Sequence, residues 1–257
     1  MDLGEDPRIL YNAAYRGEIQ TSSMRDFADR LSVRNSLISD PTLWFWTPAF
    51  QTVISWLEEN CGRGRTVLDV GCGNSSPLRF LPKVHLVGLE GYAPALEEAR
   101  RARTHDEYFS GNVKHLGDVF PNRRFDACVA LDVIEHLDKE DGWRMLADME
   151  RLATRRVIIF TPNGFIPQRS QHGDLQEHLS GWTAEEMRQR GYRVLGMYGL
   201  KSLRGEYHRV KFQPRAFWVL VSMLTHYVYT RTRPEKAAAI YCAKDLVLTA
   251  VPHPHTR

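Results

Sequence analysis

The stretch "VLDVGCGNSSPLRFLPKVHLVGLEG", from Val67 to Gly91, decides the fold that this chain is expected to adopt. One apolar run ends at Asp69 and leads into Gly71 and Gly73, and a second apolar run ends at Glu90. Only glycine lets a tight turn bring backbone N–H groups against a ligand, and an acid about 20 residues later can bind two ribose hydroxyls. The stretch therefore predicts a strand, a loop and a second strand that together hold an adenosine cofactor.

Details of the loop separate the two classes of cofactor that suit this geometry, dinucleotides and S-adenosylmethionine (SAM). A dinucleotide fingerprint needs a third glycine, and this chain has Ser76 there, followed by Pro77. The chain instead carries Asp69, two residues before the first glycine. A carboxylate at that point is unfavourable beside a pyrophosphate but suits a cofactor with a cationic amino group. The loop therefore favours SAM.

Strand and helix patterns alternate along the chain from Thr66 onward. Strand candidates rich in Val, Leu and Ile lie at 66–70, 85–90, 113–116, 126–131 and 156–161. Helix candidates lie at 93–103 and 139–153, and further on come a Thr183–Glu186 capping box, a strand at 192–199 and a strand at 238–248. Near-continuous apolar strands are typical of a sheet that is buried on both faces. The order predicts an α/β fold with a doubly wound, mostly parallel sheet.

Domain organisation follows from the same patterns. We expect a helical N-terminal cap over 1–60, a main domain over 61–250 and a short tail over 251–257. The main domain carries an apolar helical insert near 212–233. In the cap, "DPTLWFWTPAF" groups aromatic residues that either staple the cap to the sheet or form a wall over the substrate.

Composition and charge exclude several classes of protein. Of 257 residues, 43% are hydrophobic and 25% are charged, which is ordinary for a soluble globular protein. The acidic N-terminus does not resemble a secretory signal, and no apolar run reaches the roughly 20 residues that cross a bilayer. The net charge of +3 is too small to argue for nucleic acid. Cysteines without a C-x-x-C pair, with Cys128 and Cys242 in apolar runs, predict a reduced, cytoplasmic protein.

Four phrases carry a resemblance to a known family. In order and spacing, "VLDVGCGNS", "VGLE", "GDVF" and "FDACVALDVIEHL" resemble the successive motifs of class I SAM-dependent methyltransferases over roughly 60–200. The resemblance implies a seven-stranded, Rossmann-like sheet whose last strand, near 238–246, runs antiparallel to the rest. The chain departs from the pattern at Ser75, where many members have a third glycine.

The resemblance also implies which residues bind SAM. Asp69, Gly71 and Gly73 would surround the methionine part, and Glu90 would bind the ribose. At the other end of the cofactor, the residues implied are Asp118 near the adenine amino group, Val119 beside the ring, and Leu131 and Asp132 along the cofactor.

The phrase "LDVIEHLD" leaves an alternative open. Asp132, Glu135 and His136 have the spacing D-x-x-E-H, which resembles E-x-x-E-H of ubiquinone-pathway O-methyltransferases and of small-RNA 3′-terminal 2′-O-methyltransferases, where these residues are associated with a metal. His178, after the fifth strand, is placed like a further histidine of the RNA enzymes. Similar phrases also resemble bacterial sugar and natural-product methyltransferases without a proposed metal.

We expect no metal here, because the first acid is Asp and an acid at a helix start is common for dipole reasons. His178 is then the candidate general base, with Asp132 and His136 as further catalytic candidates.

The sequence thus predicts a SAM-dependent methyltransferase acting on a small-molecule acceptor, most simply a hydroxyl of a sugar, a lipid-linked molecule or a secondary metabolite. An RNA 3′-terminal 2′-O-methyltransferase is the alternative, although nucleic acid is disfavoured by the lack of a basic face. A non-catalytic SAM-binding scaffold is the second alternative, and the intact loop acids argue against it.

The insert "KFQPRAFWVLVSMLTHYVYTRTRPEK" is apolar around most of its circumference, with a narrow polar stripe and basic flanks. A helix of that kind is usually buried, so we expect it to pack against its own domain or against a second subunit in a homodimer. Peripheral contact with a membrane surface is the second interpretation of 212–233.

Overall fold

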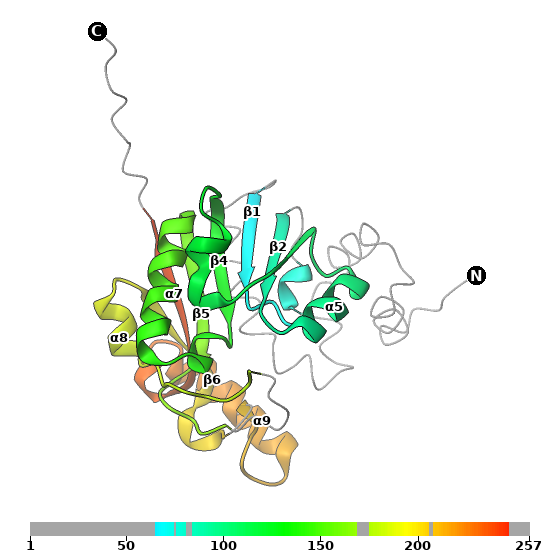
Figure 1. Ribbon diagram of the computed structural model, residues 1–257. Coiled ribbons are helices and arrows are strands. Elements are labelled where there is room, and N and C mark those ends of the chain that lie inside the picture. The colour runs from blue at the N-terminus through cyan, green and yellow to red at the C-terminus, as the bar shows by residue number, and fades with distance from the viewer. Residues whose placement is uncertain (1–64, 75, 81–83, 169–174, 206–207, 247–257) are drawn as a thin grey trace, which may run out of the picture.

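The computed structural model describes residues 65–74, 76–80, 84–168, 175–205 and 208–246 (Figure 1). The expected cap at 1–60, the tail at 251–257 and Ser75 lie outside the described residues. A search of the described residues finds no helix with the length and apolar character that a bilayer-crossing segment needs.

One seven-stranded sheet forms the centre of the domain, in the order β3-β2-β1-β4-β5-β7-β6. The strands are β1 (Arg65–Val70), β2 (Val84–Glu90), β3 (Glu107–Ser110), β4 (Phe125–Leu131), β5 (Ala153–Pro162), β6 (Arg193–Leu200) and β7 (Ala237–Asp245). Neighbours from β3 to β5 pair in parallel, whereas β7 runs antiparallel to both β5 and β6. The expected α/β fold and the antiparallel last strand are confirmed.

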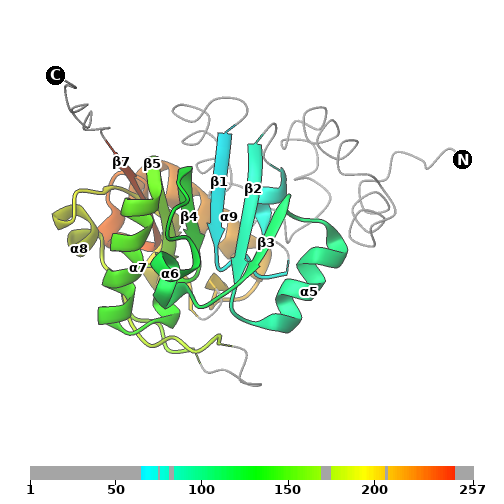
Figure 2. The ribbon, with the colours of Figure 1, turned by 45° about the horizontal axis from the view of Figure 1, so that its top comes forward.

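Helices cover the sheet and connect its strands (Figure 2). They are α5 (Ala93–Ala102), α6 (Leu116–Val119), α7 (Lys139–Leu152), α8 (Ala184–Gln189) and α9 (Arg215–Thr225). Shorter turns are the 3-10 turns Pro77–Phe80, Val113–His115, Ile134–His136, Lys201–Leu203 and Pro234–Lys236, and the π-helical turn His226–Thr230. The predicted capping box starts α8, since the Thr183 hydroxyl accepts the Glu186 N–H and the Glu186 carboxylate accepts the Thr183 N–H.

The expected strand at 113–116 is wrong. The third strand is β3, at Glu107–Ser110, and Val113–His115 is a 3-10 turn that Asn112 caps by accepting the Lys114 N–H at 2.9 Å. The cause is the position of β3 at the edge of the sheet, where it pairs only with β2 and is half-exposed. An edge strand needs no continuous apolar run, and β3 therefore lacks the sequence pattern that identifies a buried strand.

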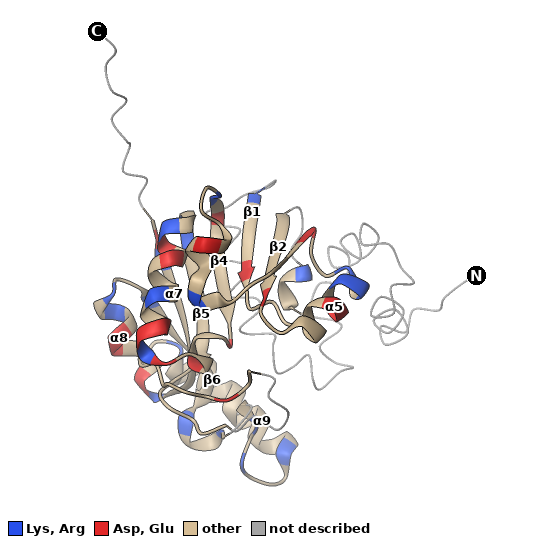
Figure 3. Cartoon of the chain, viewed as in Figure 1, with Lys and Arg blue, Asp and Glu red and all other residues tan. Residues whose placement is uncertain are grey.

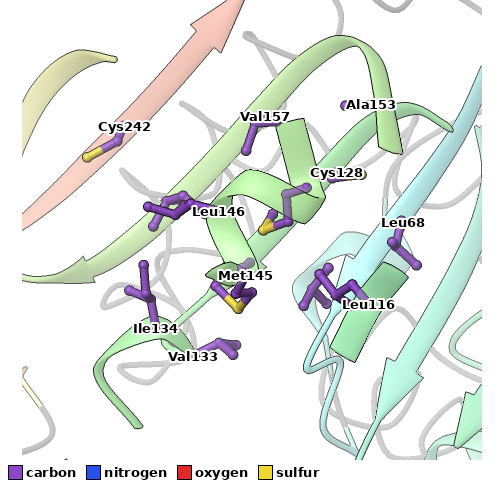
Figure 4. Packing of buried hydrophobic residues seen from close by; sticks show 14 of the residues in the cluster. Leu68, Leu116, Cys128, Val133, Ile134, Met145, Leu146, Ala153, Val157 and Cys242 are labelled. Carbon is purple, nitrogen blue, oxygen red and sulfur yellow. The ribbon is translucent and has the colours of Figure 1, made fainter. Parts of the chain in front are cut away.

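The core lies on both faces of the sheet. Successive side chains of a strand point to opposite faces. Leu68 belongs to the same cluster as Met145 and Leu146 of α7 (Figure 4), while Val67 belongs to the cluster on the other face. Complete burial of a leucine contributes about 1.5–3 kcal/mol. The expected reduced core cysteines are confirmed, because Cys128 and Cys242 are free and fully buried.

The strand order reverses between β1 and β4, which are neighbours although β2 and β3 intervene in the sequence. At such a switch point, the loops that follow two adjacent strands diverge and leave a crevice for a ligand at the carboxyl ends of the strands. The predicted cofactor loop follows β1, and the D-x-x-E-H phrase follows β4. The fold thus positions both candidate motifs at one crevice.

The insert between β6 and β7 does not match its expected burial. It forms α9 and the π-helical turn, and α9 packs against β6. Phe217, Leu220 and Leu224 of this helix are exposed, its other large apolar side chains are half-buried, and Ser222 of its polar stripe is fully buried. The apolar residues of the helix are therefore only partly packed against the described part of their own domain.

Candidate active site

The glycine loop after β1 is tied to the end of β2. The backbone N–H groups of Gly71 and Cys72 both donate to the Leu89 carbonyl, at 2.8 and 3.0 Å. Gly71 and Gly73 have φ values of 69° and 57°, in the left-handed region that favours glycine. A Cβ atom on Gly71 would lie 2.7 Å from a methyl group of Val133, whereas one on Gly73 would meet nothing within 4 Å. Gly73 therefore borders open space in which a ligand can approach the backbone.

Glu90 ends β2 with its carboxylate fixed by the loop. One oxygen accepts the Gly73 N–H at 2.9 Å, and the other accepts the Tyr92 N–H at 2.7 Å. A carboxylate offers about four lone-pair sites, so each oxygen retains the capacity for one more hydrogen bond. This geometry fits the two hydroxyls of a ribose, as the sequence predicts for Glu90.

Asp69 lies at the loop, but its carboxylate is directed into the interior. It is 2% exposed, and its Oδ2 atom lies 3.0 Å from Nε2 of His105, whose Nδ1 lies 2.8 Å from the Thr104 hydroxyl. Gly88 makes room for this pair, because a Cβ there would lie 3.1 Å from the His105 ring. Asp69 thus supports the loop from within, and its predicted contact with the methionine part stays a prediction.

Two residues, both on α6, are predicted to lie at the adenine end of the cofactor. Asp118 lies on α6 with 88% of its side chain exposed, and its Oδ2 atom lies 4.0 Å from Nδ1 of His115. Val119 is half-buried and lies close to Gly111, so that a Cβ on Gly111 would be 2.9 Å from a Val119 methyl. Asn112 follows β3 directly, next to the Gly111 N–H that donates to the Glu90 carbonyl. The adenine roles of Asp118 and Val119 stay predictions, and Asn112 is a further candidate there.

Leu131 and Asp132 end β4 at the crevice. Asp132 has a φ of 53°, unusual for a residue with a side chain, and its N–H donates to the Phe160 carbonyl of β5 at 2.9 Å. Its carboxylate, 27% exposed, lies 3.4 Å from Nε2 of His208. Backbone strain of this kind is frequent at functional sites. Asp132 therefore lies where β4, β5 and the insert meet.

Glu135 is a buried carboxyl group, 2% exposed. The Thr161 hydroxyl donates to it at 2.9 Å. Burial, and then the charge of Asp132, raise the pKa of Glu135 well above its ordinary value. The Glu135 backbone carbonyl accepts the N–H groups of Leu179 and Ser180 at 2.8 and 3.1 Å. Glu135 thereby anchors the segment that carries His178.

His136 and His178 lie side by side, with ring centroids 4.9 Å apart. Nδ1 of His136 lies 3.0 Å from the Glu177 carbonyl, and Nδ1 of His178 lies 2.7 Å from the Ile166 carbonyl. A carbonyl only accepts, so in each ring Nδ1 carries the proton and Nε2 offers its lone pair. Burial lowers the pKa of His178 below its ordinary value. His178 is therefore neutral at neutral pH and able to accept a proton.

The same cluster has the composition of a metal site. One ligand atom each from Glu135, His136 and His178 all lie within 4.8 Å of one another. The Nδ1 contacts to backbone carbonyls are those that orient histidine ligands in known metal centres. Against a metal, burial disfavours the charged form of the Glu135 carboxyl group, and this group already accepts a hydrogen bond from Thr161. The expectation that no metal binds stays a prediction.

Two residues of the site were not predicted from the sequence. His105 supports the cofactor loop, and His208 lies against Asp132. Arg204 holds the His208 segment by donating from Nη1 to the His208 carbonyl at 2.7 Å. Neither histidine belongs to a recognisable spacing, because each reaches the site from a segment far away in the sequence.

The described residues form an α/β domain in which the predicted cofactor loop lies at the crevice between β1 and β4. Residues 68–161 match the family model of a methyltransferase domain. Over these residues the chain is similar to SAM-dependent methyltransferases, and SAM is the cofactor that such a domain implies. Glu90 and the open space at Gly73 fit that cofactor.

Relatives and solved structures were also compared. Probable tRNA methyltransferase 9B of Bos taurus and that of Homo sapiens are each 28% identical over 120 residues, which is 46% of this chain and 26% of the relative. The chain thus matches about a quarter of their length. Magnesium protoporphyrin IX methyltransferase from Synechocystis PCC 6803 is 16% identical over 87% of this chain and 96% of that chain, with a TM-score of 0.47. A bacterial Hen1 methyltransferase domain is 16% identical over 77% and 96%, with a TM-score of 0.49.

Proposed function

We propose that this protein transfers the methyl group of SAM to a hydroxyl of a small molecule, such as a sugar, a lipid-linked acceptor or a secondary metabolite. The observation that carries the proposal is the neutral His178 ring, held by its Nδ1 contact to Ile166 beside the carboxyl end of β4. An alcohol needs its proton removed as it attacks, and a neutral imidazole is the side chain suited to this task at neutral pH.

The cofactor, when bound, supplies an electrophilic methyl group and a good leaving group, so the protein mainly provides alignment and proton transfer. Glu90 binds the ribose hydroxyls with the carboxylate lone pairs that do not accept the backbone N–H groups of Gly73 and Tyr92. Gly73 lets the loop backbone approach the cofactor without a side chain in between. These residues fix the direction in which the methyl group points.

On the acceptor side, Nε2 of His178 takes the hydroxyl proton as the acceptor oxygen attacks. The imidazolium that results is stabilised by the Ile166 carbonyl and by the negative charge of Asp132, both of which raise the His178 pKa against the effect of burial. Burial raises the pKa of Glu135 and so disfavours a second negative charge in the site. His136 lies against the His178 ring and restricts its orientation.

A radiolabel assay tests this proposal. The full-length protein is incubated with [methyl-³H]SAM and separate panels of sugar, lipid-linked and phenolic or aliphatic hydroxyl acceptors. We expect label on one of these classes, without added metal and in the presence of EDTA. Label on none of them, together with tight binding of S-adenosylhomocysteine (SAH), would contradict the proposal and favour a non-catalytic SAM-binding scaffold.

One observation favours a second candidate, methyl transfer to an RNA 3′ end. Glu135, His136 and His178 form the cluster that could hold a divalent ion, and a metal can lower the pKa of a ribose hydroxyl. The probable tRNA methyltransferases above also resemble this chain over 46% of its length. In the same assay this candidate predicts label on RNA oligonucleotides, abolished by EDTA and restored by Mg²⁺ or Mn²⁺.

The proposal includes a cytoplasmic location, where SAM is used and thiols stay reduced. The three free, buried cysteines in the described part of the chain support this location.

A further inference from the structure

The insert between β6 and β7 has its polar face turned inward. The Ser222 hydroxyl of α9 donates to the Tyr198 carbonyl of β6 at 2.7 Å and accepts from Nε of Arg204 at 2.9 Å. His226 and Thr230 of the π-helical turn are also buried, at 1% and 0% exposure. The two hydrogen bonds of Ser222 fix the rotation of the helix about its axis, because a turned helix would break them inside the protein. The opposite face must therefore point away from the domain.

That outward face is apolar and large. Seven large hydrophobic side chains of the segment are between 39% and 72% exposed: Phe212, Phe217, Leu220, Leu224, Tyr227, Val228 and Tyr229. The helix is thus amphipathic with its polar stripe facing the core, whereas an ordinary surface helix has its apolar stripe facing the core. A contiguous exposed apolar face of this kind marks an interaction surface. We call these seven residues the α9 surface.

The described charged residues around the α9 surface are mainly positive. Exposed basic residues flank it, namely Lys211, Arg215, Arg233 and Lys236. Within 208–234 the sequence has no Asp or Glu, and Glu235 is paired with Arg188. In Figure 3, α9 is mostly tan and carries blue but no red. An apolar face with a basic rim and aromatic residues is the composition of helices that lie in the interface of an anionic bilayer.

The α9 surface lies at the same edge of the sheet as the candidate active site. In Figure 1, β1 and β2 point toward the end of the domain at which α9 lies. Arg204 contacts Ser222 of α9 and also donates to the His208 carbonyl, and His208 in turn lies 3.4 Å from Asp132. The inner, polar side of α9 is thus linked through Arg204 and His208 to the acceptor side of the crevice.

We propose that the α9 surface docks the protein on an anionic lipid bilayer, with the carboxyl edge of its sheet toward the membrane. The basic residues around the α9 surface favour an anionic bilayer over a second copy of the chain as the binding partner. In a two-fold dimer through this face, the same basic residues of the two copies would lie close together and repel each other. The docking does not depend on which acceptor is methylated.

Vesicle flotation tests the proposal on the full-length protein with bound SAH. The vesicles are phosphatidylcholine alone and phosphatidylcholine with about one third phosphatidylglycerol, each at low and high salt. We expect flotation with the anionic vesicles and at least about tenfold weaker partitioning to neutral ones, with a loss at high salt. An absence of flotation with anionic vesicles would overturn the proposal.

Two variant pairs locate the contact. Leu220→Ser/Leu224→Ser removes exposed apolar side chains and should weaken partitioning at least about tenfold, since each leucine contributes several-fold on burial. Arg215→Glu/Arg233→Glu should weaken binding to anionic vesicles at least about tenfold and leave the neutral ones unchanged. The matched control Arg101→Glu/Arg124→Glu makes the same charge change at exposed positions outside the insert and should bind like the wild type.

Folding and assembly are monitored in the same samples. Thermal unfolding and SAH binding should be unchanged in all variants, because the replaced side chains are exposed. Light scattering reports the mass of the protein without lipid. If the wild type is a dimer and the Leu220→Ser/Leu224→Ser variant is a monomer, the α9 surface binds a second copy of the chain. That result would overturn the proposal that it binds a lipid bilayer. Equal flotation of the wild type and both pairs would also overturn the assignment to α9.

Discussion

The two sides of the crevice are built in different ways. On the cofactor side, the glycine loop and Glu90 are held almost wholly by backbone groups, with N–H donors on both oxygens of the carboxylate. On the acceptor side, titratable side chains contact one another: Asp132 meets His208, and His136 meets His178. The first arrangement provides a rigid shape for a fixed ligand. The second provides groups whose protonation can change during a reaction.

This difference predicts that variants on the two sides affect different quantities. Backbone contacts on the cofactor side should govern stability and cofactor affinity. Side chains on the acceptor side should govern the rate and its dependence on pH. The following experiments test this division.

The largest effect is expected for His178→Ala. Removal of a general base lowers the rate about 100- to 10,000-fold, while the affinity for SAH should stay within about threefold of the wild type, measured by calorimetry. Since burial lowers the His178 pKa, the wild-type rate should fall on the acid side only below pH 6.5, where the ring becomes protonated. A normal rate with His178→Ala would remove this histidine from the mechanism. His115→Ala, an exposed histidine, is the matched control.

Gly71→Ala should chiefly affect folding. Its φ is positive and its new Cβ would lie 2.7 Å from Val133, so unfolding in urea should report a loss of about 3 kcal/mol. Gly73→Ala shares the positive φ but has open space around the new methyl group. It should lose only about 1 kcal/mol yet weaken SAH binding, because the methyl enters the space reserved for the ligand. Equal effects of the two variants on SAH binding would contradict the assignment of the open space beside Gly73 to the cofactor.

Glu90→Ala should weaken SAH binding about 30-fold, because the ribose loses two hydrogen bonds to a charged group. Water that replaces the carboxylate reduces this loss. NAD should bind neither protein measurably in the same titration. Glu98→Ala is the control, since that carboxylate lies near the loop but on the exposed side, bonded to Asn74. An unchanged SAH affinity in Glu90→Ala would break the assignment of the ribose site.

The smallest effect concerns His226, under α9. Burial, followed by the charges of Arg231 and Arg204, lowers the pKa of His226 to about 4. In the unfolded chain its pKa is about 6.5, so between pH 6.5 and 4 only the unfolded state binds the proton. Stability should therefore fall as the pH falls through this window, by about 1–2 kcal/mol at pH 5. His226→Gln should reduce this slope in urea unfolding, and His115→Gln should not.

Much of the fold could be predicted because its signals are local. The β1 loop, the Thr183 capping box and the apolar strands are each specified by residues adjacent in the sequence. The strand β3 was missed because its stability comes from pairing with β2 at the sheet edge rather than from its own apolarity.

The candidate site could be predicted only in part. Glu90 lies close in sequence to the loop that it binds. His208 meets Asp132 across 76 residues, and Asp69 meets His105 across 36. No local pattern encodes such contacts, since the sheet order and the insert bring these residues together. The orientation of α9 was missed for a related reason: its polar stripe has a partner, Arg204, that composition does not reveal.

The hairpin of β6 and β7 has a consequence for engineering. Leu200 pairs with Ala237 at the base of the insert, so the two ends of the segment are one strand spacing apart, about 4.8 Å. A segment with such closely held ends can be exchanged for another of different length at a small entropic cost. Chimaeras that receive this segment from other methyltransferases, while the sheet and the SAM loop stay unchanged, would therefore provide a route to redirecting the enzyme toward new acceptors.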